Sequence, residues 1–260
     1  MKAVQLKILP VDLLPAYLDE IKKNTACVFA NLADNELSAG TFSFYTSVSA
    51  VFSSKIEGEP IELDSFIKHK KLGVSFLPDY TQKVDDLYEA YQFAKKNLLN
   101  AETVHQAHKL ISKHILLEQS RGALRTMNMF VMTPDGKIEY VACQPSDVRT
   151  EITKLYNDIE ELLKLELNFG EVLFFASLIH LVFVKIHPFE DGNGRLARLL
   201  EKWFLAQKLG DKAWFVQSEK YYYRHHQQYY ANIRRMGLAY EVLDYTRAMP
   251  FLKMIVMALE

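Results

Sequence analysis

The stretch VLFFASLIHLVFVKIHPFEDGNGRLAR, residues 172–198, joins a strongly apolar segment to a dense group of chemically reactive side chains. Residues 172–186 are apolar nearly all round a helix, which predicts a buried central helix. This run is shorter than the roughly 20 residues needed to cross a bilayer, and Ser177, His180 and Lys185 interrupt it. We expect His180 to be a core histidine. Helical periodicity resumes in RLARLLEKWFLAQKL, and Gly210 is a stop signal, so HPFEDGNG (187–194) is predicted to be a loop between two helices.

The loop at 187–194 has features that suit a phosphate ligand. A helix that begins near Asn193 or Gly194 exposes unpaired backbone N–H groups and the positive end of its dipole. Gly192 and Gly194 allow an anion to approach the backbone closely. Asp191 lies beside them, and a lone carboxylate suits Mg²⁺, which keeps several waters. The alternative is an ordinary helix–helix turn, which has a similar Pro/Gly/Asn/Asp composition.

Three more side chains extend this chemistry. Arg195 and Arg198 are three residues apart and share a helix face, so both can donate charge-assisted hydrogen bonds to phosphates. His187, with an ordinary pKa of about 6.5, is suited to act as a general base near neutral pH. A calcium loop is excluded, because Leu196 would stand where that loop needs glycine.

The residues His187 to Arg198 resemble the complete signature of the Fic (filamentation induced by cAMP) family. That pattern is a histidine, any residue, phenylalanine, any residue, an acid, Gly-Asn-Gly-Arg, two free positions and arginine, and HPFEDGNGRLAR fills every fixed position. The preceding apolar helix, which ends in Lys185-Ile186, also matches. The resemblance extends over about residues 53–235 and implies a mostly helical fold. It also implies transfer of part of a nucleotide, usually AMP from ATP, to a protein hydroxyl.

The resemblance implies a role for each residue of the loop. His187 would deprotonate the target hydroxyl, Phe189 would anchor the loop in the core, and Asp191 would hold Mg²⁺ between the α- and β-phosphates. Phosphate contacts would come from the anion hole of Asn193 and the Gly192–Gly194 backbone, from Arg195 towards the β-phosphate, and from Arg198 at the γ-phosphate.

The second glycine of the signature separates two reactions. Doc-like kinases depart from the pattern there and bind ATP reversed, whereas an intact Gly194 favours AMP transfer. The attacking hydroxyl, the α-phosphorus and the leaving pyrophosphate would be in line, and catalysis would rest on positioning and charge stabilisation.

A second stretch, SSKIEGEP (53–60), ends a predicted helix over about residues 43–58. Gly58 is expected as its C-terminal cap, and Pro60 prevents its continuation. Glu57 stands at the negative end of the helix dipole, which costs about 0.3–1 kcal/mol unless a cation lies nearby. From the residues alone, a tolerated surface glutamate is the alternative.

The pattern Ser53-x-x-x-Glu57-Gly58 resembles the inhibitory motif of the Fic family. The resemblance implies that Glu57 pairs with Arg198 and occupies the γ-phosphate site. It also implies membership of the class that carries its inhibitory helix in the same chain, N-terminal to the catalytic loop.

The segment MFVMTPDGKIEYVAC (129–143) predicts a β-hairpin around Thr133–Gly136. It resembles the flap of the Fic family, with Gly122-x-x-Arg125 before it and Pro145 after it. Met132 and Thr133 would then register the target segment by strand addition. An ordinary structural hairpin remains the alternative.

Tyr229 and Tyr230 are similar to a tyrosine pair that lines the adenine pocket in some members of the family. Those members often have an asparagine some turns later, where this chain has Gly237, and simple core packing is the alternative. His105, His108 and His114 form no complete zinc set, so we expect a partly exposed helix there.

The composition is that of an ordinary globular chain. Of 260 residues, 49% are hydrophobic and 24% charged, and the formal charge of −1 favours neither nucleic acid nor an anionic membrane. The basic run KHKK (68–71) is interpreted as a solvated loop. Cys27 and Cys143 build no disulfide framework or zinc spacing. The first residues have no apolar run typical of a signal peptide, so a cytoplasmic location is expected.

Together these patterns predict a mainly α fold, with a Fic-type helical core, a short β-hairpin flap and an N-terminal helical extension. We expect an N-terminal helical region over 1–80, a core over 81–240, and a C-terminal helix over 241–260 packed on the core. The function expected is Mg²⁺-dependent transfer of AMP from ATP to a Ser, Thr or Tyr hydroxyl of a target protein, inhibited by Glu57. A homo-oligomer is a further expectation. The rival functions are removal of AMP by a bifunctional enzyme, and a catalytically silent module that binds a nucleotide or a partner.

Overall fold

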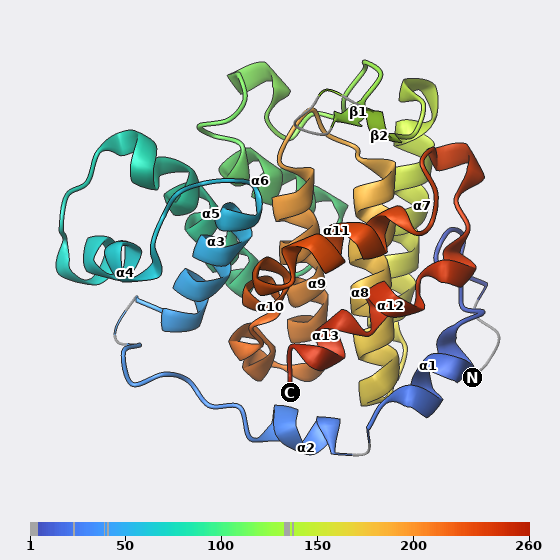
Figure 1. Cartoon of the computed structure of the whole chain (residues 1–260), viewed down its shortest axis with the longest axis horizontal. Helices are drawn as coiled ribbons and strands as arrows, with labels where there is room; N and C mark the ends of the chain where they lie inside the picture. The colour runs from blue at the N-terminus through green and yellow to red at the C-terminus, as the bar shows by residue number, and fades with distance from the viewer. Residues whose placement is uncertain (1–4, 23, 39, 41, 133–135, 137) are drawn as a thin grey trace.

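The computed structural model describes residues 5–22, 24–38, 40, 42–132, 136 and 138–260. The fold is mainly helical with one small sheet, as the sequence predicts (Figure 1). The α-helices are α1 (Leu14–Glu20), α2 (Thr25–Ala30), α3 (Phe44–Ile56), α4 (Leu63–Leu72), α5 (Pro78–Lys96), α6 (Ala101–Ile111), α7 (Pro145–Lys164), α8 (Phe169–Ile186), α9 (Asn193–Leu209), α10 (Ser218–Arg224), α11 (His226–Arg234), α12 (Met249–Leu252) and α13 (Met254–Met257). Short 3₁₀ turns are η1 (Glu118–Ser120), η2 (Asp211–Phe215), η3 (Tyr240–Val242) and η4 (Tyr245–Arg247).

Helix α8 is the centre of the fold, and it packs most extensively against α9 (Figure 1). It begins with a capping box, in which Asn168 and Glu171 satisfy each other's backbone N–H groups. By length and apolarity α8 could cross a membrane, but 78% of it is buried inside the protein. Core helices of folded domains have this character, and burying each large apolar side chain contributes about 1.5–3 kcal/mol.

Helix α3 lies across this core and packs against α4, α5 and α10. It begins after the cap residue Ser43, whose side chain accepts a hydrogen bond from the Thr46 N–H. Its last helical residue is Ile56, with Glu57 as the cap and Gly58 at a positive φ of 91°. The helix therefore ends close to the predicted position, with Glu57 rather than Gly58 as the cap residue.

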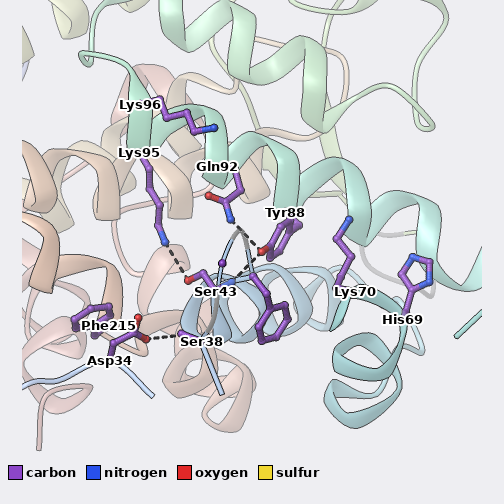
Figure 2. A pocket seen from close by; sticks show the side chains of 12 residues that line it. Asp34, Ser38, Ser43, His69, Lys70, Tyr88, Gln92, Lys95, Lys96 and Phe215 are labelled. Carbon is purple, nitrogen blue, oxygen red and sulfur yellow. Dashed lines mark hydrogen bonds between the residues drawn. The ribbon is translucent and has the colours of Figure 1, made fainter. Parts of the chain in front are cut away.

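The first turn of α3 is tied to α5 beside an open hollow of about 990 Å³. Figure 2 shows the Lys95 ammonium directed at Ser43, to which it donates a hydrogen bond of 3.1 Å. The same group donates to Thr46 Oγ1 at 2.6 Å, and the backbone N–H of Ser43 donates to the Tyr88 hydroxyl. These bonds fix the end of α3 that lies far from Glu57.

The predicted hairpin is present as β1 (Phe130–Met132) and β2 (Ile138–Val141), an antiparallel pair. Val141 also bridges to Ala239, so β1 is the outer strand. Met132 is half exposed on β1, whereas Thr133 and most of the turn lie outside the described residues.

The C-terminal segment differs from the single helix expected over 241–260. It consists of η3, η4 and two four-residue helices, α12 and α13. Asp244 caps a local turn by accepting from the Thr246 N–H, and Pro250 stands in the first turn of α12, where its missing N–H is tolerated. The segment still packs on the core, because Leu252 and Ile255 are fully buried.

Candidate active site

His187 terminates α8 and turns the chain into the loop. It caps the helix at φ 53° and ψ 61°, the one non-glycine residue with positive φ in the described part of the chain. A left-handed conformation is strained for a residue with a Cβ, and such residues concentrate at functional sites. The ring is half-buried, and its Nδ1 lies 3.3 Å from the carbonyl oxygen of Val184. The imidazole therefore lies at the rim of the core rather than inside it.

The loop behind His187 is braced by two buried contacts. The Phe189 ring is fully buried and stacks on His108, with ring centroids 3.8 Å apart. Asn193 receives a hydrogen bond from the Phe189 N–H at 3.0 Å and donates to the Phe189 carbonyl at 2.9 Å. Since both ends of the Asn193 side chain are engaged, this residue can offer an anion its backbone N–H rather than its amide.

Arg125 fixes the loop from the other side. Its Nε donates to the His187 carbonyl at 2.7 Å, and its backbone N–H donates to the Pro188 carbonyl at 3.0 Å. Its guanidinium also donates to the carbonyls of Met127 and Cys143, next to the two hairpin strands. Arg125 therefore connects the loop to the hairpin, as its position before the predicted flap suggested.

The N-terminal end of α9 faces the Glu57 carboxylate. The helix begins at Asn193, as predicted, and its cap residue Gly192 supplies no side-chain cap. A Cβ at Gly194 would lie 2.6 Å from Glu57 Oε1, so this position has to be glycine for the carboxylate to approach. Asp191 is exposed beside it and accepts from the Gly192 N–H at 2.5 Å. Helix α9 has 17 residues, and its uncapped N-terminus lies next to the exposed Asp191 carboxylate. These two groups together suit a phosphate that binds a cation.

The carboxylate of Glu57 is held by Arg198. Arg198 Nη2 donates to Glu57 Oε1 at 2.5 Å and to the Ser53 carbonyl at 3.0 Å, and Nε donates to Ser53 Oγ at 2.8 Å. Burial alone would raise the pKa of Glu57, but the positive charges of Arg198 and Arg195 outweigh it and lower the pKa. For Arg198 burial is likewise outweighed, and the charge of Glu57 raises its pKa. The pairing expected from the inhibitory motif is thus present in the structure.

A second carboxylate, which the sequence patterns did not indicate, pairs with the other arginine. Glu59 Oε1 lies 3.4 Å from Arg195 Nη2 and accepts from Lys83 Nζ at 2.8 Å. The side chain of Arg195 is only 6% exposed, and its Nε is buried without a hydrogen-bond partner in the described part of the chain. Glu59 follows Glu57 by two residues across a glycine, and that spacing was the available signal.

A small cavity of about 140 Å³ lies against these groups. Its lining includes Glu57, Val131, Tyr140, Lys185, His187, Gly194, Arg198, Tyr229, Tyr230 and Ile233. The two predicted tyrosines therefore face the same space as the loop and Glu57. Ligand pockets usually measure about 300–1,000 Å³, so this cavity is small for a nucleoside triphosphate while Glu57 is in place.

Lys185 is a buried cation in the wall of this cavity. Its ammonium lies 4.0 Å from the centre of the Tyr140 ring and donates to the Gly237 carbonyl at 3.3 Å. Burial lowers its pKa to about 8. In the sequence, Lys185 is only part of the resemblance to the Fic family, and its place in a cavity wall could not be predicted from it.

The protonation state of His187 suits a proton acceptor. Burial, together with the charge of Arg125, lowers its pKa to about 4, despite the opposing charges of Glu57 and Asp191. The ring is therefore neutral at physiological pH. A neutral imidazole at the rim of an anion-binding loop can accept a proton from a hydroxyl presented by a substrate.

His105 and His108 bond backbone carbonyls around the loop. Helix α6 is partly exposed, as expected, but His108 is fully buried on its inner side, and its Nε2 lies 2.9 Å from the Asp191 carbonyl. His105 Nδ1 bonds the Gly122 carbonyl at 2.7 Å. No cluster of three or more His, Cys, Asp or Glu groups occurs among the described residues. The carboxylate of Asp191 is left as the candidate cation ligand, which fits Mg²⁺ held mainly by phosphates and water.

The sequence model of the Fic/DOC family matches residues 98–205, from the start of α6 to the last turns of α9. This part of the chain therefore matches the Fic/DOC family over less than half of the chain's length. It contains His187, the loop and both arginines.

Solved structures of Fic proteins share the fold well beyond that range. A Fic family protein from Desulfovibrio desulfuricans aligns over 100% of this chain and 74% of its own, with a TM-score of 0.69 and 19% identity. A Fic-domain signalling protein from Bacteroides thetaiotaomicron aligns over 95% and 92%, with a TM-score of 0.61 and 16% identity. A fragment of Fic-1 from C. elegans aligns over 95% and 70%, with a TM-score of 0.61 and 17% identity. No curated protein matches the sequence.

Proposed function

We propose that this protein is an adenylyltransferase that transfers AMP from ATP to a Ser, Thr or Tyr hydroxyl of a target protein, and that Glu57 inhibits it. The observation that carries the proposal is the Glu57 carboxylate, bound to Arg198 and lying over Gly194 at the start of α9. A carboxylate held by a buried guanidinium at a helix N-terminus stands in for a phosphate.

Inhibition follows from competition for one position. Arg198 cannot give the same N–H groups to Glu57 and to a phosphate, and the cavity of about 140 Å³ is too small for a triphosphate. The last turn of α3 must therefore move before ATP binds productively. Its first turn is tied to α5 through Lys95, which favours a local displacement near Glu57 over release of the whole helix.

Catalysis in the released form is assigned to the loop. His187 accepts the proton of the attacking hydroxyl, and the N–H groups at the start of α9 bind oxygens of the α-phosphate. Arg195 and Arg198 neutralise the leaving pyrophosphate. Since Arg125, Phe189 and Asn193 hold the backbone rigidly, the groups are preorganised and little rearrangement accompanies the reaction.

The residues present fit one divalent cation. Asp191 would hold Mg²⁺, which when bound offsets the negative charge of the phosphates and orients them. The outer strand β1, with Met132, offers an edge against which a segment of the target could pair.

The test is incorporation of labelled AMP by the Glu57→Gly variant. A charge-assisted hydrogen bond contributes about 1.5–3 kcal/mol, so its loss should raise AMP transfer about ten- to a hundredfold. Labelled ATP is incubated with Mg²⁺ and a cell lysate, and adducts on this chain and on lysate proteins are read by gel and intact mass.

The matched control is the double variant Glu57→Gly/His187→Ala, which should form no adduct although its pocket is open. An adduct formed equally with and without His187 would exclude the imidazole as the base. If Glu57→Gly shows no gain over the wild type with any protein present, Glu57 does not inhibit, and the proposal fails. Incubating labelled protein with Mg²⁺ and no ATP measures removal of AMP separately.

A further inference from the structure

A chain of buried hydrogen bonds leads from Arg198 into the core. Arg198 Nη1 lies 3.3 Å from the Tyr229 hydroxyl, and that hydroxyl lies 2.9 Å from His180 Nε2. His180 Nδ1 lies 2.7 Å from Glu201 Oε2. All four side chains are at most 1% exposed, and they come from α8, α9 and α11.

The two ends of this chain fix its direction. A guanidinium can only donate, so the Tyr229 oxygen accepts from Arg198, and with a neutral His180 the tyrosine proton points to its Nε2. A carboxylate can only accept, so His180 Nδ1 carries the proton that faces Glu201. Every donor thus points from Arg198 towards Glu201. His180, expected from the sequence to be a core histidine, has both ring nitrogens hydrogen-bonded.

The contacts of Arg198 fall into two groups. Its bonds to Ser53 Oγ, the Ser53 carbonyl and Glu57 all involve α3, the helix whose end must move in the proposed function. The bond to Tyr229 belongs to the core and does not depend on α3. When the end of α3 is displaced, Tyr229 is therefore the recorded partner that still holds the guanidinium in the cavity.

We propose that Glu201 and His180 are positioning residues that orient the Tyr229 hydroxyl so that it holds Arg198 ready for the terminal phosphate of ATP. This inference rests on the proposed function and adds a second part to the nucleotide site. Glu57 binds the Arg198 guanidinium from one side and excludes a phosphate, and Tyr229 positions the guanidinium from the other side. Because a preorganised guanidinium loses less freedom on binding, the chain raises affinity for the triphosphate.

The experiment uses the full chain with Glu57→Gly as the reference and adds Tyr229→Phe, Glu201→Gln or both. Tyr229→Phe removes only the hydroxyl, and Glu201→Gln keeps the shape but no longer fixes the direction of the bonds. We expect Tyr229→Phe to raise KM for ATP about tenfold with a smaller change in kcat, as for loss of one hydrogen bond to a charged group. Glu201→Gln should shift KM in the same direction, and the double variant should be no worse than Tyr229→Phe, because the residues act in series.

The matched control is Tyr222→Phe. The Tyr222 hydroxyl is as buried and donates to the same Glu201 Oε2 at 2.8 Å, but within the described part of the chain it forms no hydrogen bond to Arg198. This variant should keep the KM of the reference, and thermal unfolding checks that all variants fold.

Nucleotide-free crystal structures give a readout that needs no activity. We expect the Arg198 guanidinium to stay on Tyr229 in Glu57→Gly and to leave that position in Glu57→Gly/Tyr229→Phe. A guanidinium that remains in place without the hydroxyl, or additive losses from Glu201 and Tyr229, would overturn the positioning role. If instead the guanidinium moves but Glu57→Gly never forms an AMP adduct, the proposed function fails while the positioning role stands.

Discussion

At the scale of single residues, His187 combines three properties that are unusual for a histidine. It adopts a left-handed backbone conformation, its ring is half-buried, and burial lowers its pKa to about 4. All three follow from its place as the cap residue directly after α8, where the helix ends and Arg125 Nε donates a hydrogen bond to its carbonyl. The strain is offset by the buried bonds of the loop, which hold the imidazole beside the start of α9.

The low pKa of His187 determines the pH dependence expected for the proposed AMP transfer. Because the pKa of His187 lies near 4, its neutral, basic form is complete well below pH 6.5, and the rate should stay flat from about pH 6 upwards. In Glu57→Gly the loss of a negative neighbour lowers this pKa further. The check is kcat/KM for ATP in Glu57→Gly between pH 4.5 and 8. An inflection at or above pH 6.5 would show that burial does not control the imidazole.

Residues that form a local sequence motif could be predicted from the sequence. Residues whose role depends on packing against a distant part of the chain could not. The order of His187, Asp191, Gly194 and Arg198 is local, so a motif contains it. His108 supports the same loop from 83 residues away, and its sequence neighbourhood suggested only an ordinary helix. Such a role exists only after α6 packs against α9, and no local pattern records it.

At the scale of elements, the end of α3 and the residues after it supply one carboxylate to each of the two arginines of α9. Glu57 ends the helix and binds Arg198, and Glu59 binds Arg195 and Lys83 beyond the Gly58 turn. Gly58 reverses the chain direction so that two acids two residues apart reach two arginines three residues apart on α9. Competition with a polyphosphate would therefore involve both carboxylates.

Glu59→Gln should weaken this second contact without touching the first. The Glu59–Arg195 separation of 3.4 Å is longer than that of the Glu57–Arg198 pair, so we expect a gain in AMP transfer of severalfold, smaller than for Glu57→Gly. Lys83→Met removes the other partner of Glu59 and is the matched control, since it should not raise activity. The measurement is incorporation of labelled AMP from ATP. If Glu59→Gln has the same activity as the wild type, Glu59 forms a surface ion pair and does not compete with the nucleotide.

Element boundaries were predictable where one residue dictates them. Gly58 and Gly210 end their helices through a positive φ, and both ends lie close to where they were expected. The C-terminal segment was not predictable as short pieces. Its apolar residues have helical spacing, but the Asp244 cap and Pro250 divide it, and its burial against α8 compensates for lost helical bonds.

At the scale of the whole molecule, His108 connects the candidate active-site loop to the fold. Its Nδ1 accepts from the Gly122 N–H at 2.9 Å, so its Nε2 carries the proton and donates to the Asp191 carbonyl. Its ring also stacks on Phe189. One neutral imidazole thus joins α6, the segment before the hairpin and the loop, and all three depend on it staying uncharged.

Protonation of His108 should therefore destabilise the whole domain. Burial lowers its pKa to about 4, whereas the unfolded chain titrates near the ordinary 6.5. As the pH falls from 6.5 towards 4, the unfolded chain binds the proton first, and folding loses up to about 3 kcal/mol from this group. His187 acts in the same direction. Urea unfolding between pH 4.5 and 7.5 measures the slope.

His108→Phe tests the assignment, because it keeps a ring over Phe189 but has no group to protonate. The variant should be less stable at pH 7 by about 1–3 kcal/mol, since the Gly122 N–H and the Asp191 carbonyl lose their partner. Its stability should fall less steeply than that of the wild type below pH 6.5, with the remaining slope due to His187 and to carboxylates. His187→Ala is the parallel control, and its slope should be reduced independently. If His108→Phe keeps the full wild-type slope, the imidazole of His108 is not the group that couples acid to unfolding, and the loop is held by Arg125 and Asn193 without it.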